Sequence, residues 1–195
     1  TIFNGSRYAR TDYLGHDHSD RDTPQALLVE QFPDSHIPPH FHGIDQFQVV
    51  VAGTGRLGKH DLAPLCEHFT KGYTGYGPVT APYGDTLVYF TLRAQSEPGA
   101  FFLPEAKDRQ KPGKKRNLTV DVAAAGAGVA GTRVLDAVIE PEADGLGAWL
   151  MRLGPGEGMD GPDPDTGGGQ YYVVLDGTMR EREAALEKWS CVFVC

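Results

Sequence analysis

The stretch "HIPPHFHGIDQFQVVVAGTG", His36–Gly55, has three histidines within seven residues, followed by β-forming residues and a glycine-rich turn. Residues two apart in an extended segment point to the same face, so His40 and His42 present two imidazoles together. The chain can turn back through the next three residues, which brings Gln46 to the same point, or Asp45 if the register differs by one. This spacing predicts a metal site. The alternative is that both histidines only form hydrogen bonds inside a polar pocket.

The strand that follows, residues 46–52, sets the orientation of its neighbours. If Gln46 points inward, Gln48 and Val50 point inward too, because strand side chains alternate. Phe47 and the two valines at 49 and 51 then cover the other face. That face is also apolar, so we expect it to be buried against a second module or a partner chain.

The composition indicates a folded, turn-rich all-β chain. It has 195 residues with 25 glycines and 14 prolines, distributed between short apolar runs. The net charge of −8 disfavours nucleic acid and anionic membranes as partners, and no apolar run has the length of a membrane span. Three cysteines, an odd number, do not form a regular disulfide framework, which favours a reducing, cytoplasmic location.

Three parts are expected along the chain. Residues 1–103 contain a polar arm and a first strand-rich module, and residues 104–131 read as a linker because they are polar and rich in charge and glycine. Residues 132–195 restart with strand-like runs. Within them, residues 180–188 suit either a helix or a charged β-hairpin. The given sequence stops at an apolar strand for which it suggests no partner strand. We therefore expect a homo-oligomer in which another subunit covers this strand.

An internal repeat supports two modules. Six residues separate Gln46 from Gly53, and six separate Gln170 from Gly177. The first copy follows His-x-His, whereas the second follows Asp163-Pro-Asp165. Such self-similarity indicates two copies of one module.

The first copy resembles the cupin superfamily, whose first motif reads G-x5-H-x-H-x3,4-E-x6-G. Here the pattern is His40-x-His42-x3-Gln46-x6-Gly53, with glutamine in place of glutamate and no leading glycine. The second cupin motif matches in frame at Gly75 and at Pro82-Tyr83-Gly84. Its histidine position holds Leu87, and its asparagine position holds Thr91. The resemblance covers residues 26–93 well and residues 133–194 weakly.

The resemblance implies an all-β fold, a cupin-type β jelly-roll barrel in two tandem modules, the second incomplete and degenerate. It also implies one divalent transition metal (Fe, Mn, Ni, Cu or Zn). The implied ligands are His40, His42 and Gln46, and His60, His68 and His36 are candidates for a replacement ligand. The residues expected to line a substrate pocket are Gln48, Tyr76, Tyr83 and Leu87.

Two functions follow as hypotheses. The first is a metal-dependent enzyme acting on a small organic substrate, with dioxygenase chemistry the commonest that the resemblance implies, and isomerase or lyase chemistry as others. The second is a non-catalytic small-molecule-binding cupin, which the replacements at Gln46 and Leu87 favour. Metal content and its dependence on His40 and His42 discriminate between them.

Overall fold

The structure is a computed structural model that describes residues 2–3, 6–15, 21–122 and 129–195. Two compact units are present: residues 1–121 with 173–191, and residues 122–172 with 192–195. Strands dominate both units, and the only helices among the described residues are two short 3-10 turns, η1 (Lys107–Arg109) and η2 (Pro164–Thr166). None of the described helices is long and apolar enough to span a membrane. The expected all-β class is confirmed.

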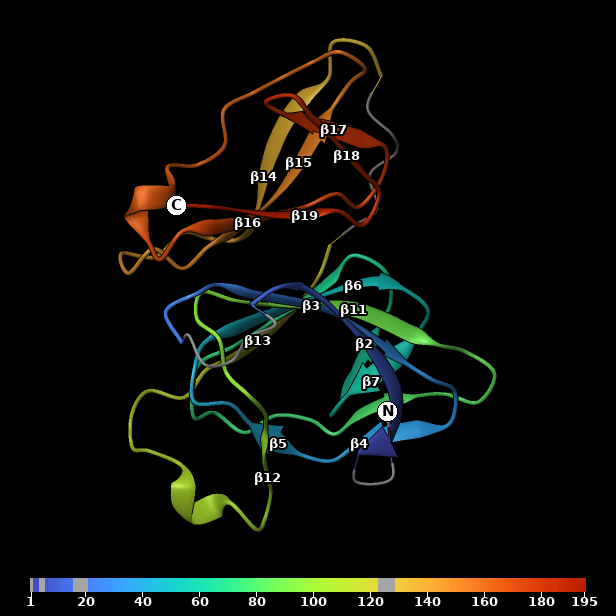
Figure 1. Cartoon of the computed structure of the whole chain (residues 1–195), viewed down its shortest axis with the longest axis vertical. Helices are drawn as coiled ribbons and strands as arrows, with labels where there is room; N and C mark the ends of the chain where they lie inside the picture. The colour runs from blue at the N-terminus through green and yellow to red at the C-terminus, as the bar shows by residue number, and fades with distance from the viewer. Residues whose placement is uncertain (1, 4–5, 16–20, 123–128) are drawn as a thin grey trace. The chain divides into compact units, whose positions relative to one another are not determined.

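The larger sheet of the first unit has the strand order β1-β2-β3-β11-β6-β9-β13 (Figure 1). At its centre β11 pairs antiparallel with both β3 and β6, and all seven of its residues are buried. In β6, Gln46, Gln48 and Val50 are buried and the residues between them are only half-buried, as the alternation predicts. The bounds of this sheet are β1 Ile2–Phe3, β2 Ser6–Leu14, β3 Gln25–Gln31, β6 Gln46–Ala52, β9 Cys66–Thr70, β11 Leu87–Arg93 and β13 Asn117–Asp121.

A smaller sheet of order β4-β10-β7-β8 packs against the inner face of the larger one. Leu57, Leu62 and Val79 of this sheet share one buried cluster with Val29 and Tyr89 of the larger sheet. The core therefore lies between two antiparallel sheets, which is the arrangement of a β-sandwich or jelly roll. The bounds are β4 Ser35–Ile37, β7 Gly55–Leu57, β8 His60–Leu62 and β10 Val79–Ala81.

A separate two-stranded ribbon carries the histidines. It consists of β5 (His40–Phe41) and β12 (Phe101–Phe102), and Phe102 lies opposite His40. Phe41 is fully buried and stacks on Phe101 with ring centroids 5.1 Å apart. Because Phe41 points to one side of the ribbon, the two histidines that flank it point to the other.

The segment expected to be a linker, residues 104–131, contains a strand. Residues Asn117–Asp121 form β13, which pairs with β9 and completes the edge of the larger sheet. Two of the basic side chains that suggested a solvated linker lie over aromatic rings: Arg109 lies over the Phe101 ring and Arg116 over the Phe69 ring. The charged residues that precede β13 concealed the strand pattern, since only Asp121 within the strand is charged.

The C-terminal region forms three two-stranded sheets: β14 with β15, β16 with β19, and β17 with β18. Residues 180–188 adopt the hairpin alternative, because most of them lie in β17 and β18. The last strand pairs with β16, so the feature that suggested a homo-oligomer is satisfied within the chain; the oligomer itself stays a prediction, as does the division into two cupin modules. The bounds are β14 Arg133–Ile139, β15 Ala148–Leu153, β16 Gln170–Val173, β17 Thr178–Glu181, β18 Ala184–Glu187 and β19 Cys191–Val194.

The repeated glycines offer a matched pair of substitutions. Both adopt a left-handed backbone, with φ of 71° at Gly53 and 75° at Gly177. A Cβ at Gly53 would lie 1.8 Å from the Thr86 carbonyl oxygen, whereas a Cβ at Gly177 meets nothing within 4 Å. We expect Gly177→Ala to lower the free energy of unfolding by about 1 kcal/mol through strain alone. Gly53→Ala should cost about 1–2 kcal/mol more, because the backbone at Thr86 must move. Urea denaturation measures both, and equal losses would show that Gly53 does not approach Thr86 so closely.

Candidate functional site

The inward face of the first unit gathers His40 of β5, His42 just after it, Gln46 of β6 and three residues contributed by later segments. The imidazoles of His40 and His42 lie edge to face with ring centroids 5.5 Å apart, and both side chains are buried. Tyr76, which forms a bridge with His40, packs its ring 4.4 Å from that imidazole. The predicted convergence of residues 40, 42 and 46 is therefore present in the structure.

The tautomer of His40 follows from its partners. Its Nδ1 lies 2.7 Å from the carbonyl oxygen of Pro38, which can only accept, so Nδ1 carries the proton. Its Nε2 then accepts a hydrogen bond from the Tyr76 hydroxyl at 2.7 Å. The Tyr76 oxygen in turn accepts from Nε2 of Gln46 at 2.6 Å. These bonds form one chain of donation that runs from Gln46 to Pro38.

His42 is held by Glu97, which follows the end of β11. Its Nδ1 donates to Glu97 Oε2 at 2.8 Å, and the other carboxylate oxygen accepts from the backbone N–H of Gly43 at 2.8 Å. A carboxylate behind an imidazole fixes its orientation and leaves Nε2 as the acceptor that faces inward. Glu97 was not among the sequence-predicted residues.

Arg93, the last residue of β11, occupies the centre of this group and was also missed by the sequence reasoning. Its guanidinium donates to Gln46 Oε1 from Nη2 at 2.9 Å and from Nε at 3.1 Å, and to Gln25 Oε1 at 2.6 Å. Nη2 also lies 3.0 Å from Nε2 and 3.1 Å from Nδ1 of His42. The pairing of Arg93 with Gln25 across β11 and β3 places it on the inner face, and only 6% of it is exposed.

Burial sets the protonation states of the site. It lowers the pKa of His40 to about 3, with His42 and Arg93 nearby acting in the same direction against the Pro38 hydrogen bond. It also lowers the pKa of His42 to about 4, together with Arg93 and against Glu97. Burial alone would raise the pKa of Glu97, but the hydrogen bonds from His42 and Gly43 outweigh it and the pKa is lowered. At neutral pH both imidazoles are therefore neutral and Glu97 is ionised.

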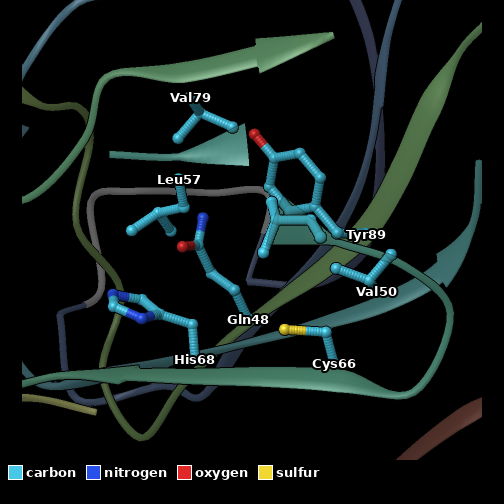
Figure 2. Close-up of a pocket in the computed structure, with 8 residues that line it drawn as sticks. Gln48, Val50, Leu57, Cys66, His68, Val79 and Tyr89 are labelled. Atoms are coloured by element: carbon cyan, nitrogen blue, oxygen red, sulfur yellow. The ribbon is translucent and has the colours of Figure 1, made fainter. Parts of the chain in front are cut away.

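A small cavity lies beside this group, between the two sheets (Figure 2). The space inside it suffices for about one water molecule, and Figure 2 shows the Gln48 amide pointing into it next to His68. Gln48 Oε1 is buried and has no hydrogen-bond partner among the described residues. The lining residues are Gln48, Val50, Leu57, Leu62, Cys66, His68, Val79 and Tyr89.

His68 connects the cavity to the histidine group. Its ring lies 5.6 Å from the Tyr76 ring, and its nitrogens lie 2.8 Å from the Thr119 hydroxyl and 2.6 Å from the Thr70 hydroxyl. Burial lowers its pKa to about 4. Both nitrogens are thus held by threonines, and the imidazole is neutral at pH 7.

Several sequence-predicted residues lie elsewhere. His60 is exposed on β8, and Tyr83, at 93% exposure, stands on a turn outside the cavity. Leu87 is fully buried in the core cluster but does not line the cavity. Asp45 accepts from the backbone of Gly72 instead of facing the histidines. In the second copy, Asp163 accepts from the N–H of Asp165 and caps η2, which is a turn role.

The residues as placed do not fit a divalent metal ion. A metal on the two inward Nε2 atoms and Gln46 Oε1 would need positions that Tyr76 and Arg93 hold, and the guanidinium would repel it. The nearby carboxylate, Glu97, is engaged on the outer nitrogen of His42. Within the described part of the chain, no three His, Cys, Asp or Glu side chains form a metal-binding group. The predicted ligands therefore converge, but around a cationic side chain.

The chain was compared with known proteins. No protein-family model matches it, and no curated protein does. Among solved structures it is similar to the polyketide cyclase RemF from Streptomyces resistomycificus, with 21% identity and a TM-score of 0.43 over 51% of this chain and 73% of that one. It is also similar to oxalate decarboxylase from Bacillus subtilis, a protein with Mn(II) centres, with 11% identity and a TM-score of 0.40 over 53% of this chain and 32% of that one. A protein with a cupin-like fold from Ralstonia eutropha gives 15% identity and a TM-score of 0.34 over 46% of this chain and 65% of that one.

These similarities concern about half of the chain, and their identities transfer no activity to it. The architecture follows from the molecule itself. Two facing antiparallel sheets enclose the core, and residues 40, 42 and 46, at the spacing of the first cupin motif, point inward between them. The first unit of this chain is a β jelly roll with the cupin fold.

Proposed function

We propose that the first unit is a small-molecule-binding cupin whose cavity takes a small, uncharged, largely apolar organic ligand that carries one hydrogen-bond donor. The observation that carries this proposal is the buried and unpartnered Oε1 of Gln48, which points into a cavity otherwise walled mainly by aliphatic side chains. A buried acceptor without a partner costs about 1–3 kcal/mol, and a ligand N–H or O–H would recover it. The enclosed space has room for about one water molecule, so the ligand is small and the side chains that line the cavity must move to admit it.

The ionisable groups of the cavity support an uncharged ligand. Burial raises the pKa of the Cys66 thiol to about 12 and also raises that of the Tyr89 hydroxyl, and His68 is neutral at pH 7. The cavity therefore presents no formal charge to a ligand. A charged molecule would lose its hydration there without gaining a counter-charge.

Phenol and fluorobenzene test the proposal, because they have nearly the same size and only phenol donates a hydrogen bond. We expect phenol to bind about five- to tenfold more tightly, the contribution of one hydrogen bond of about 1 kcal/mol. NMR titration of the Val50, Leu57 and Val79 methyl groups locates the binding in the cavity. In Gln48→Leu the preference for phenol should disappear, while fluorobenzene still binds.

Gln110→Leu is the matched control, since Gln110 belongs to the same unit, does not line the cavity and contacts the Tyr73 carbonyl. It should keep the preference of the wild type. Equal affinities for the two probes in the wild type, or shifts at other methyl groups only, would overturn the proposal.

The acid–base groups favour binding over catalysis. A general acid or base works best with a pKa near the operating pH. The pKa of His40 is about 3 and burial raises that of Tyr76 to about 12, so this hydrogen-bonded pair is a weak base and a weak acid at pH 7. The metal-dependent oxygenase expected from the resemblance stays a prediction that the donor arrangement does not favour.

A further inference from the structure

We propose that the guanidinium of Arg93 occupies the position of the metal ion in this cupin and that the first unit works without a bound metal. In this arrangement Arg93, held by the amides of Gln25 and Gln46, takes the place that a metal ion would need between His42 and Gln46. The inference concerns the histidine group and is independent of the ligand proposed for the cavity.

The direction of the hydrogen bonds explains why residue 46 is glutamine. The Gln46 amide accepts twice from Arg93 through Oε1 and donates once to the Tyr76 oxygen through Nε2. Tyr76 can then donate to His40, whose other nitrogen donates to Pro38. A carboxylate at position 46 only accepts, so it could not support this chain of donors. The glutamine is therefore matched to an arginine and a tyrosine.

Charge balance leads to the same assignment. The group contains one buried cation, Arg93, and one buried anion, Glu97, with neutral imidazole His42 between them. A divalent ion would add two positive charges beside the guanidinium without any further anion in contact. Like charges side by side in a buried site repel strongly.

Co²⁺ titration of the metal-stripped, full-length wild-type chain tests the proposal, with visible absorption as the readout. We expect no binding that depends on His40 and His42: the wild type and His40→Ala/His42→Ala should give the same titration curve. His60→Ala, which removes an imidazole from the surface, identifies adventitious binding. One equivalent of Co²⁺ in the wild type that is lost in His40→Ala/His42→Ala overturns the proposal.

A second variant tests whether Arg93 is the cause. Arg93→Ala/Gln46→Glu removes the guanidinium and supplies a carboxylate, which leaves two imidazoles and one anionic oxygen facing inward. We expect this variant to gain about one equivalent of Co²⁺, since such a donor set suits divalent transition metals. Circular dichroism confirms that it is folded. A folded variant that binds no more Co²⁺ than the wild type shows that something other than Arg93 excludes the metal, and overturns the assignment.

Discussion

Arg93→Leu should lower the free energy of unfolding by about 3–5 kcal/mol, because it leaves buried hydrogen-bond acceptors unpaired at the centre of the first unit. The Oε1 atoms of Gln25 and Gln46 would both lose their charged donor. Burial prevents water from replacing it, as Gln25 has no exposed surface and Gln46 only 1%. Urea denaturation followed by circular dichroism measures the loss.

Arg56→Leu is the control for removing an arginine as such. Arg56 forms an ion pair with Asp61 at 2.9 Å, but 60% and 88% of the two side chains are exposed. Exposed pairs of this kind contribute about 0–1 kcal/mol. If Arg93→Leu costs no more than Arg56→Leu, the guanidinium is not buried among these acceptors and the described site is incorrect.

Stability should fall by about 3–4 kcal/mol between pH 6.5 and pH 5. Burial lowers the pKa values of His40, His42 and His68 to about 3, about 4 and about 4. Unfolded histidine titrates near pH 6.5, so the unfolded chain gains up to three protons in this range that the folded chain does not. The contribution of these histidines to the free energy of unfolding is therefore complete above the unfolded pKa and is lost as the pH falls.

Glu67 opposes part of this effect. Burial raises its pKa to about 7, so between pH 4.5 and 7 the folded chain holds one proton that the unfolded chain releases. The unfolded state takes up three protons in this range and the folded state holds one, so the net difference is about two protons. The free energy of unfolding therefore changes by about 2.7 kcal/mol per pH unit.

Denaturation at pH 6.5, 6.0, 5.5 and 5.0 gives this slope. His68→Gln should reduce it by about half, because one of the two net protons is lost. Gln110→Leu, which removes no titratable group, should leave the slope unchanged. A wild-type slope near zero would mean that the three histidines are solvated and titrate normally in the folded state.

Local patterns were sufficient to predict the sheet at the site. The alternation in residues 46–52 and the spacing from His40 to Gly53 correctly indicated which side chains point inward, because strand periodicity is a local property. A turn was expected after that strand, and Gly53 adopts a left-handed backbone there.

The residues that complete the site could not be predicted from local patterns, because they are far from the histidines in the sequence. Arg93 ends a strand that pairs with Gln25, and Glu97 lies 55 residues from His42. A charged residue at the end of an apolar strand reads as solvent-exposed, because most arginines are. Two features of the sequence could have indicated this arrangement. Residue 46 is glutamine instead of an acidic residue, and a lone arginine follows TLVYFTL. Together they indicate that the cation at the centre of the site comes from the chain itself.

A crystal structure of the wild-type chain grown with Co²⁺, with diffraction data collected at the cobalt absorption edge, would show whether an ion or Arg93 lies between His42 and Gln46. We expect Arg93 to occupy the space between His42 and Gln46, and no anomalous peak to lie within coordination distance of both Nε2 atoms, about 2.1 Å. A strong peak at that distance from His40 and His42, with Arg93 turned away, would contradict this expectation.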